Sequence, residues 1–389
     1  MRVLLVTGEY PPMQGGVGDY TWRLGSALGA LDVDVCVLTS HAAGPAHLAP
    51  QGVSNVYPEV DRWGWGVSRM VRRFAQEFEP DILHIQYQAA AYGLHPAINL
   101  LPRALRRRPW PRRLAVTFHD LRVPYIFPKA GPLRWRANLE LARHCHAVVV
   151  TNAEDCERLG AYAELRDKLA EIPIGANIQP DPPPHFDRGE QRRRYGVGPA
   201  DLLLCYFGFL NASKGGEELI QATARLAAAG LPVHLLMVGG QLGASDPTNA
   251  AYLRQVEALI QQLDLAERVH WTGFTAAGEV SANLLASDLA VLPYRDGVSF
   301  RRGSLMAVLE HGLPVVSTVP TTPIAELVHG ETIWLTPPGS AEALAEAVQL
   351  LWREPALLKR MGQAAQRLAG NFTWEAIAQR HLEVYGRLG

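Results

Sequence analysis

Cysteine, net charge and long apolar runs are all scarce in this sequence of 389 residues. Its four cysteines (Cys36, Cys145, Cys156 and Cys205) are widely spaced, so we interpret them as reduced, buried thiols and not as a disulfide framework. The formal net charge of −1 argues against a protein that binds polyanions through its overall charge. No apolar run approaches the roughly 18 residues of a membrane helix, and "MRVLLVTG" begins a predicted strand at once, without room for a signal peptide. We therefore expect a soluble, cytoplasmic protein.

The residues that are present predict a folded chain of two domains. Apolar residues make up 48% of the chain and charged residues 19%, and a chain of this length usually divides into two cores. Short apolar runs alternate with stretches of helical spacing such as Tyr20–Leu31 and Glu217–Ala229, which is typical of parallel sheets covered on both faces. The predicted strands are Val3–Thr7, Val33–Thr39, Asp81–Tyr87, Leu114–His119, Ala147–Thr151, Leu202–Gly208, His234–Gly239, Arg268–Gly273, Leu289–Tyr294, Pro314–Thr318 and Thr332–Thr336.

A proline-rich, polar segment, Ile178–Glu190, suits a linker. The sequence therefore predicts an α/β protein of two doubly wound, Rossmann-like domains, residues 1–178 and 196–370, with a linker at 179–195 and a final helix in 371–389. Because ligands of open parallel sheets bind at the carboxyl ends of the strands, we expect the site in a central cleft between the two domains.

A glycine-rich turn follows the first predicted strand. Gly15, Gly16 and Gly18 allow the backbone to approach a ligand closely, and the helix that begins near Asp19 would point its N-terminus at that ligand. The spacing is not that of the G-x-G-x-x-G dinucleotide fingerprint, which disfavours an NAD enzyme. A plain connection between strand and helix is the alternative.

Three histidines lie close to predicted strands. His119, in "VTFHDLR", ends a strand and could bind or orient a substrate, although a lone histidine is as often structural. His144 and His146 in "HCHAVVV" are too close in sequence to face one ion, and the "DVDV" at Asp32 opens a strand. We therefore expect no metal site.

The second half contains features that suit a nucleoside diphosphate. Lys214 lies in a loop between strand and helix, where a mobile cation can reach phosphate oxygens. The predicted helix that begins at Gly303–Ser304–Leu305 presents free backbone N–H groups to an anion. Glu310 lies about 9–10 Å further along that helix, at the separation of a diphosphate from a ribose.

Together these residues resemble the family 4 retaining glycosyltransferases of the GT-B fold. The resemblance covers essentially the whole chain and rests on "EYPPMQGGVGDYT", "DILHIQY", "TFHD", "IPIGANI", "FGFLNASKG", "LMVGG", "WTGF" and "GSLMAVLEHGLPVVS". It implies sugar transfer from a nucleotide donor with retention of configuration, without a cofactor or a bound metal. It also implies that the first domain faces the acceptor, that the second binds the nucleotide sugar, and that the final helix crosses back to the first domain.

The resemblance assigns roles to single residues. His119 would contact the transferred sugar, while Lys214 and the backbone at Gly303, Ser304 and Leu305 would hold the diphosphate. Glu310 would bind the ribose, and backbone near Phe274 the base. The glycine turn (Gly15, Gly16 and Gly18) would approach the donor phosphate and the acceptor. The expected acceptor-side residues are Gly16, Asp19, Tyr20 and Asp120.

Two positions depart from the family pattern. Phe209 stands where the family usually has an arginine that supports the diphosphate, and Arg302 stands where it usually has a glutamate that binds the donor sugar. One hypothesis is that the positive charge has moved to Arg302, with or without Arg301, which would make Arg302 a catalytic residue beside His119 and Lys214. The alternative is that Arg302 pairs with Asp296 and never meets the ligand.

Other functions stay open at this point. A nucleotide-sugar epimerase or hydrolase on the same fold would need carboxylates in the site, for which Asp19, Asp120 and Asp296 are candidates. The two departures would also suit a catalytically impaired protein that binds nucleotide sugars. The donor base (UDP, GDP or ADP) and the acceptor, whether a glycan, a lipid-linked sugar or a small molecule, are not encoded in a readable motif, and no nucleic-acid partner is expected.

An arginine-rich segment gives one indication that the protein binds a membrane surface. In "LPRALRRRPWPRR" the arginines surround Trp110, and such a patch could dock at the inner face of an anionic membrane. A solvated helix end is the favoured alternative. The arginines are Arg103, Arg106, Arg107, Arg108, Arg112 and Arg113.

Overall fold

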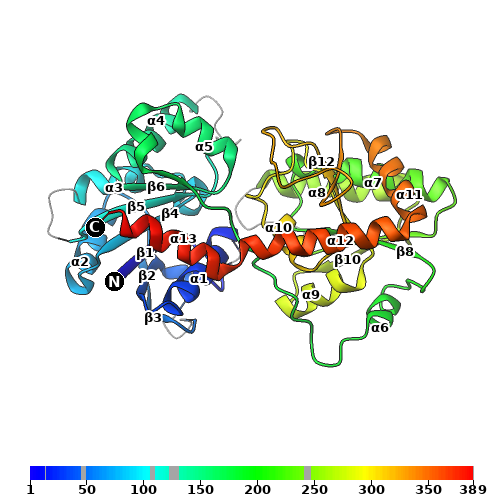
Figure 1. The fold of residues 1–389 in the computed structure, drawn as a ribbon, viewed down its shortest axis with the longest axis horizontal. Helices are drawn as coiled ribbons and strands as arrows, with labels where there is room; N and C mark the ends of the chain where they lie inside the picture. The colour runs from blue at the N-terminus through cyan, green and yellow to red at the C-terminus, as the bar shows by residue number, and fades with distance from the viewer. Residues whose placement is uncertain (14, 45–49, 106–109, 122–130, 241–246, 389) are drawn as a thin grey trace. The chain divides into compact units, whose positions relative to one another are not determined.

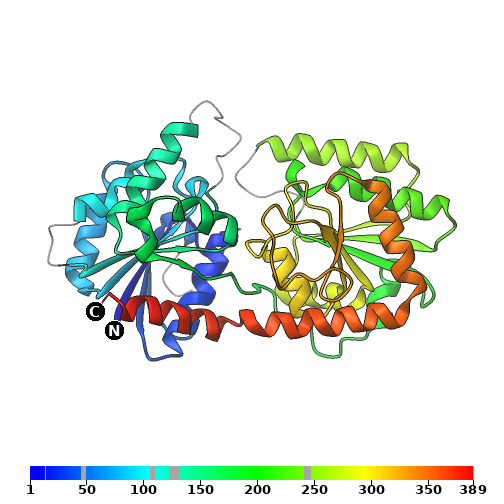
Figure 2. The ribbon, with the colours of Figure 1, turned by 45° about the horizontal axis from the view of Figure 1, so that its top comes forward.

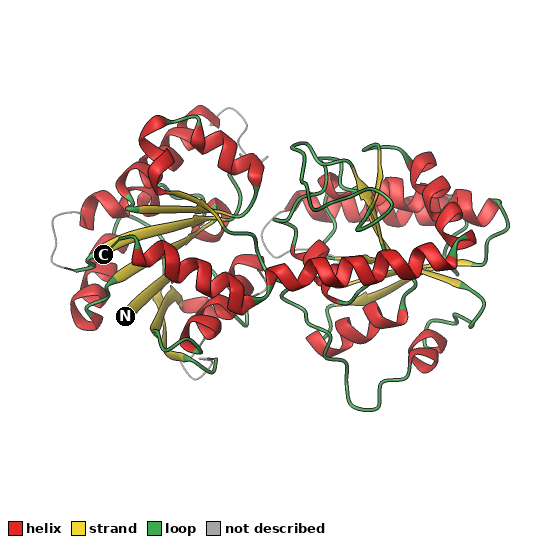
Figure 3. Cartoon of the chain, in the orientation of Figure 1, coloured by secondary structure: helices red, strands yellow, loops and turns green. Residues whose placement is uncertain are grey.

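A parallel β-sheet forms the centre of each half of the chain, with helices packed around it (Figures 1 and 3). The computed structural model describes residues 1–13, 15–44, 50–105, 110–121, 131–240 and 247–388. The contacts between residues divide the chain into two units. Unit 1 is Met1–Gly175 together with Thr373–Gly389, and unit 2 is Ala176–Phe372.

The sheet of unit 1 has the strand order β3-β2-β1-β4-β5-β6-β7, and every neighbouring pair is parallel. Its strands are β1 (Arg2–Thr7), β2 (Asp34–Ser40), β3 (Val53–Val60), β4 (Ile82–Tyr87), β5 (Arg113–Phe118), β6 (Ala147–Val150) and β7 (Leu169–Glu171). The strand order reverses beside β1, between its neighbours β2 and β4. That reversal is where an open parallel sheet binds its ligands.

Helices cover both faces of this sheet. The α-helices of unit 1 are α1 (Gly16–Gly29), α2 (Val67–Phe78), α3 (Ala97–Leu105), α4 (Gly131–His144), α5 (Ala153–Gly160) and α13 (Trp374–Gly386), with short 3₁₀ turns η1 (His41–Ala43), η3 (Ala89–Tyr92) and η5 (Ala163–Lys168). Alternate strand residues face opposite sides. One set, which includes Leu4 and Leu83, packs with α2 to α5, and the other, which includes Val3 and Ile82, packs with α1 and α13. Figure 2 shows α13, in red, beside α1.

The sheet of unit 2 has the order β10-β9-β8-β11-β12-β13, again with all pairs parallel. Its strands are β8 (Leu202–Phe207), β9 (Val233–Val238), β10 (Val269–Gly273), β11 (Leu289–Leu292), β12 (Val315–Thr318) and β13 (Trp334–Thr336). Its helices are α6 (Arg188–Arg193), α7 (Gly216–Ala228), α8 (Pro247–Gln262), α9 (Ala277–Ala286), α10 (Gly303–Glu310), α11 (Ala341–Arg353) and α12 (Pro355–Ala369), with 3₁₀ turns η6 (Ala212–Lys214) and η7 (Gly370–Phe372). The strand order reverses beside β8, between β9 and β11.

Some elements differ from the sequence-based expectation. Strand β3 was not expected because only Val53, Val56 and Val60 of its eight residues are buried and it contains Pro58, and β7 is a three-residue edge strand. The segment 179–195, expected as a linker, clusters with unit 2 because it contains α6, which packs against α9. All four cysteines are free thiols, but Cys156 is only half-buried.

Candidate active site

Glycines shape the connection that follows β8 in unit 2. Gly208 has a φ of +120°, and a Cβ atom built on it would lie 3.2 Å from Lys214 Nζ and 3.6 Å from Ser304 Cβ. Gly215 has a φ of +69° and comes so close to Pro293 that a Cβ atom would lie 2.0 Å from its carbonyl oxygen. Both positions therefore favour glycine, and together they bring Lys214 to the N-terminus of α10.

Lys214 is a half-buried cation at the end of turn η6. The side chain of Asn211 caps this turn by accepting a hydrogen bond from Ser213 N at 3.1 Å. Burial, followed by the neighbouring charge of Arg302, lowers the pKa of Lys214 to about 7, while Asp296 acts in the opposite direction. A ligand with negative charge would stabilise the protonated amine.

Arg301 and Arg302 converge on one carboxylate. Arg302 Nη2 donates to both carboxylate oxygens of Asp296, and Arg301 Nη2 lies 3.1 Å from Asp296 Oδ2. The guanidinium of Arg302 also lies over the ring of Tyr294, 4.7 Å from its centroid. Arg302 therefore pairs with Asp296, and its role toward a ligand stays a prediction.

The N-terminus of α10 faces this cluster. The hydroxyl groups of Ser304 and Tyr294 are 2.7 Å apart, which fixes the first turn of the helix against the loop after β11. Among the described residues, no acceptor is recorded for the backbone N–H groups of Gly303, Ser304 or Leu305. Such groups carry the positive end of the helix dipole and can bind an anion.

Glu310, at the other end of α10, is half-buried, and the described residues provide no recorded hydrogen bond or ion pair for its carboxylate. Burial raises its pKa. Phe274, which follows β10, is 67% exposed, and Phe209 is half-buried. Phe209 accepts a hydrogen bond from Tyr206 through its carbonyl, so its side chain adds no cation to the cluster.

In unit 1, the glycine turn differs from the expectation of a free helix N-terminus. Glu9 Oε1 accepts hydrogen bonds from Val17 N at 3.1 Å and from Gly18 N at 3.4 Å. A Cβ atom on Gly15 would lie 2.2 Å from that same oxygen, so the glycine is what admits the carboxylate. Glu9 therefore occupies the N–H groups at the start of α1 that were expected to face a phosphate. Gly16 is exposed, and a Cβ atom there would meet nothing within 4 Å.

The residues expected on the acceptor side differ in how deeply they are buried. Asp19 is half-buried in the first turn of α1, and burial raises its pKa to about 6 although Arg23 opposes the shift. Asp120 is half-buried after β5. Tyr20 is only 2% exposed, so it lies inside the unit. From the sequence it was expected at a surface that contacts the acceptor.

His119 follows β5 and is tied to β4. Its backbone N–H donates to Tyr87 O at 3.0 Å, and its Nε2 lies 3.0 Å from Gln86 Oε1. The ring of Tyr20 contacts the imidazole edge to face, with centroids 4.6 Å apart. Neither Gln86 nor Glu9 was identified from the sequence, although each is a polar residue at or just after the carboxyl end of an apolar strand.

Other polar residues have structural roles. His144 Nδ1 bonds to Glu140 O at 2.9 Å, and His146 Nδ1 accepts from Leu114 N at 3.0 Å. The described residues contain no group of three or more His, Cys, Asp or Glu side chains placed to hold a metal ion. None of the described helices is long and apolar enough to span a membrane.

Part of the arginine-rich segment is engaged within the protein. Arg112 pairs with Asp81 at 3.6 Å and lies 4.6 Å from the centroid of the Trp110 ring, and Arg113 Nε donates to Leu388 O at 2.6 Å. Arg103 is exposed on α3, whereas Arg106, Arg107 and Arg108 lie outside the described residues.

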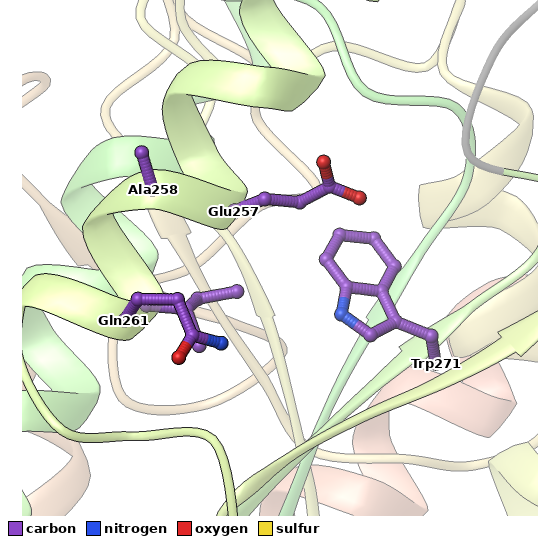
Figure 4. Close-up of a pocket in the computed structure, with 5 residues that line it drawn as sticks. Glu257, Ala258, Gln261 and Trp271 are labelled. Atoms are coloured by element: carbon purple, nitrogen blue, oxygen red, sulfur yellow. The ribbon is translucent and has the colours of Figure 1, made fainter.

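A shallow pocket lies elsewhere on unit 2, between α8 and the edge strand β10 (Figure 4). It has a volume of about 370 Å³, and Trp271 faces Glu257 and Gln261 across it. Ala258 and Ile260 complete its lining. None of the predicted site residues takes part in this pocket.

Comparison with known proteins matches both halves of the chain. The description "Glycosyl transferase 4-like domain" matches residues 15–175, and "Glycosyl transferases group 1" matches residues 187–368. D-inositol 3-phosphate glycosyltransferase of Pseudarthrobacter chlorophenolicus is 25% identical over 419 residues, covering 99% of this chain and 94% of the relative. A GDP-mannose-dependent alpha-(1-6)-phosphatidylinositol dimannoside mannosyltransferase of Mycobacterium tuberculosis is 26% identical over 407 residues, covering 100% and 97%.

Solved structures share the fold. Sucrose-phosphate synthase from Thermosynechococcus elongatus superposes with a TM-score of 0.80 at 21% identity, covering 100% of this chain and 99% of that one. Anabaena HepE in complex with UDP and glucose gives a TM-score of 0.75 at 20% identity, with both chains covered completely.

Proposed function

The chain belongs to the group 1 glycosyltransferases and has the GT-B fold, and from this we propose that it transfers a sugar with retention of configuration and without a bound metal ion. The coarser activity, transfer of a sugar from a nucleotide-sugar donor, is that of the family. The observation that carries the finer proposal is the cation cluster of unit 2, in which Arg301 and Arg302 pair with the carboxylate of Asp296 and the charge of Arg302 acts on Lys214.

This cluster supplies the charge that a leaving diphosphate needs. Breaking a bond to a diphosphate builds negative charge on its oxygens, and fixed cations and N–H dipoles stabilise that charge well in a partly buried site. We assign the diphosphate to Lys214 and to the free N–H groups of Gly303, Ser304 and Leu305. Arg302 holds Asp296, so that the carboxylate does not neutralise Lys214. A metal ion would duplicate this function.

The remaining donor contacts follow α10 and β10. The carboxylate of Glu310, which has no recorded partner among the described residues, lies seven residues after Gly303, about 10 Å along the helix, and can accept hydrogen bonds from both ribose hydroxyls. The nucleobase is assigned to the backbone near Phe274.

Unit 1 supplies the groups for the sugar and the acceptor. His119 is assigned to the transferred sugar, and Gly16, Asp19 and Asp120 to the acceptor, whether a glycan, a lipid-linked sugar or a small molecule. Tyr20 is assigned a supporting role behind His119 because it is buried. Since Glu9 already occupies the N–H groups at the start of α1, we do not assign a phosphate to that helix.

A donor panel tests the proposal. The protein is incubated with UDP-glucose, ADP-glucose and GDP-mannose, together with simple sugars and inositol as acceptors, with and without EDTA. We expect one donor to release its nucleoside diphosphate, EDTA to leave the rate unchanged, and NMR of the product to show the anomeric configuration of the donor. Epimerised donor without release, or binding without turnover, would contradict the proposal.

A Lys214→Met variant tests whether turnover in this panel depends on the cation. It removes the cation while keeping a side chain of similar length, and we expect a fall in turnover of about 10²-fold or more. Lys359→Met is the control, because Lys359 is an exposed residue on α12 with no recorded contact to the described residues of the proposed site.

We also propose peripheral contact with a membrane. Its support is the exposed Arg103 and the aromatic Trp110, and each basic residue near an anionic surface contributes about 1 kcal/mol. Sedimentation with vesicles of anionic phospholipid tests it, comparing the protein with an Arg103→Glu, Arg106→Glu, Arg107→Glu variant. Equal sedimentation of the two proteins would remove the membrane from the function.

A further inference from the structure

The imidazole of His119 is held on one side by an amide and on the other by an aromatic ring. Its Nε2 lies 3.0 Å from Gln86 Oε1, and the ring of Tyr20 contacts it edge to face at 4.6 Å. Burial, with His381 nearby, lowers the pKa of His119 to about 3. At neutral pH the ring therefore carries one N–H group and one free lone pair.

The partner of Nε2 decides which nitrogen carries the hydrogen. With the amide of Gln86 placed so that its oxygen, which can only accept, faces the ring, Nε2 donates and is the protonated nitrogen, and the amide nitrogen of Gln86 is buried without a recorded partner among the described residues. Nδ1 then holds the lone pair. No described residue is recorded as a hydrogen-bond partner of Nδ1, which makes it the ring nitrogen available to a ligand.

His381 of α13 holds the ring of Tyr20, which packs against His119. His381 Nδ1 lies 2.8 Å from Ile377 O, which can only accept, so Nδ1 of His381 is protonated and its Nε2 is an acceptor. The hydroxyl of Tyr20, 3.4 Å away, therefore donates to that Nε2. Through Tyr20, α13 restrains the plane of the His119 ring.

Side chains alternate between the two faces of the sheet along β4, and this places Gln86 on the same face as His84. His84 and Gln86 on β4 and Thr117 on β5 all point to the face of the sheet covered by α1 and α13, and all three are fully buried. A neutral amide at position 86 accepts the hydrogen bond without raising the pKa of the histidine, as a carboxylate would. A neutral ring is what the reaction requires, because positive charge develops on the sugar when its anomeric bond breaks.

We propose that Gln86 is a positioning residue of the transfer reaction, which fixes His119 as its Nε2–H tautomer and so makes Nδ1 an acceptor for a hydroxyl group of the transferred sugar. This inference rests on the proposed function, since it assigns the ligand of His119 to the donor sugar. It identifies Gln86, which acts through His119 and does not itself touch the substrate, as a determinant of how the donor is held.

The tautomer can be measured without any activity. In the full chain labelled with ¹⁵N-histidine and free of ligand, long-range ¹H–¹⁵N correlation distinguishes a protonated Nε2 from a protonated Nδ1, and a His119→Asn variant assigns the signal. We expect His119 to show a protonated Nε2 and a bare Nδ1. A protonated Nδ1 would overturn the proposal, since it would mean that the amide of Gln86 presents its nitrogen to the ring.

Addition of UDP-glucose or GDP-mannose to the same sample tests the ligand. We expect the Nδ1 resonance of His119 to shift with the donor that supports transfer and to stay in place with the nucleoside diphosphate alone. An unmoved Nδ1 resonance at saturating donor would contradict the sugar contact. If neither donor is transferred, the proposed activity fails while the tautomer measurement still decides the role of Gln86.

A Gln86→Glu variant separates positioning from mere packing. The new carboxylate would raise the pKa of His119, whose titratable neighbours recorded among the described residues are Tyr20 of α1, His84 of β4 and His381 of α13. We expect the ratio of the variant's rate to the wild-type rate, each measured at saturating donor, to be about tenfold lower near pH 6 than near pH 8.5. Gln88→Glu, on the same connection but without a recorded bond to His119, is the control. A loss of rate that is the same at every pH would show that Gln86 only packs.

Discussion

Glu9 and Val17 are joined by a hydrogen bond from the backbone N–H of Val17 to Glu9 Oε1, 3.1 Å long, so that a carboxylate of the chain itself caps helix α1. The same oxygen accepts from Gly18 N at 3.4 Å. The cap explains why a glycine is needed at position 15, where a side chain would overlap the carboxylate. It also makes this corner of unit 1 acidic, with Asp19 in the same turn of the helix.

Replacing Glu9 by alanine should destabilise unit 1. The substitution leaves two N–H groups at the start of α1 without their acceptor, and loss of a helix cap costs about 1 kcal/mol. Chemical denaturation measures the change, with Glu157→Ala, an exposed position on α5, as the control. Sulfate should stabilise the Glu9→Ala variant more than the wild type, because the vacated N–H groups can bind an anion. Equal stabilisation of both proteins by sulfate would argue against an open cap.

A Gly208→Ala variant should lose nucleotide binding. Its Cβ atom would lie 3.2 Å from Lys214 Nζ, and the φ of +120° would be strained by roughly 1–2 kcal/mol. Gly230→Ala is the matched control, since Gly230 also has a positive φ, +82°, but its Cβ atom would meet nothing within 4 Å. Both variants should lose stability, and only Gly208→Ala should lose affinity for UDP or GDP in calorimetry. Similar affinities in the two variants would remove Lys214 from the diphosphate site.

Binding of a nucleoside diphosphate should weaken as pH rises. The pKa of Lys214 is about 7 in the free protein, and a diphosphate beside it would raise that value, so binding takes up a proton above pH 7. Affinity is then full below the free pKa and is lost as pH rises through it, by up to about tenfold per pH unit. Titration calorimetry between about pH 7.5 and 9 measures this, because the terminal phosphate, with a second pKa of about 6, is already dianionic there.

Lys214→Arg serves as the control for that experiment. An arginine keeps its charge throughout the range, so its affinity should not change with pH. A wild-type affinity as flat as that of the variant would show that Lys214 is protonated in the free protein and that its surroundings do not lower its pKa.

A double-mutant cycle on Arg302 and Asp296 should show how Arg302 affects turnover. If Arg302 acts by holding Asp296 away from Lys214, Arg302→Ala should lower turnover by about tenfold, and Asp296→Ala added to it should restore much of the rate. If Arg302 instead contacts the diphosphate directly, the second substitution restores nothing. Initial rates of diphosphate release from the four proteins distinguish the two outcomes.

The strand pattern made most of the framework predictable. Runs such as Leu202–Gly208 and Ala147–Thr151 are apolar throughout because both faces of a parallel sheet are buried, and they correspond to β8 and β6 within a residue or two at each end. Strand β3 was not predicted because at the edge of the sheet only three of its eight residues are buried, so it lacks a continuous apolar run.

Within the candidate site, contacts that depend on tertiary packing were not predictable. Tyr20, Leu24 and Leu28 share one buried face of α1 at a spacing of four residues, and this spacing was not used when Tyr20 was expected on the acceptor side. Its bond to His381 joins residues 361 positions apart, which no local pattern contains. The pairing of Arg302 with Asp296 was weighed as an alternative, but only the folded loop after β11 shows which partner the arginine takes.

The position of α13 has a consequence for how the chain is made. His84 Nδ1 lies 2.6 Å from the Tyr385 hydroxyl, and Trp374, Ile377 and Tyr385 complete one face of the core of unit 1. During synthesis the ribosome therefore releases the first 175 residues long before the helix that finishes their core exists, whereas Ala176–Phe372 is continuous and can fold as soon as it emerges. The core of unit 1 is completed only after the carboxyl-terminal helix has been synthesised. A nascent chain arrested before residue 373 would therefore expose the apolar surface that α13 covers.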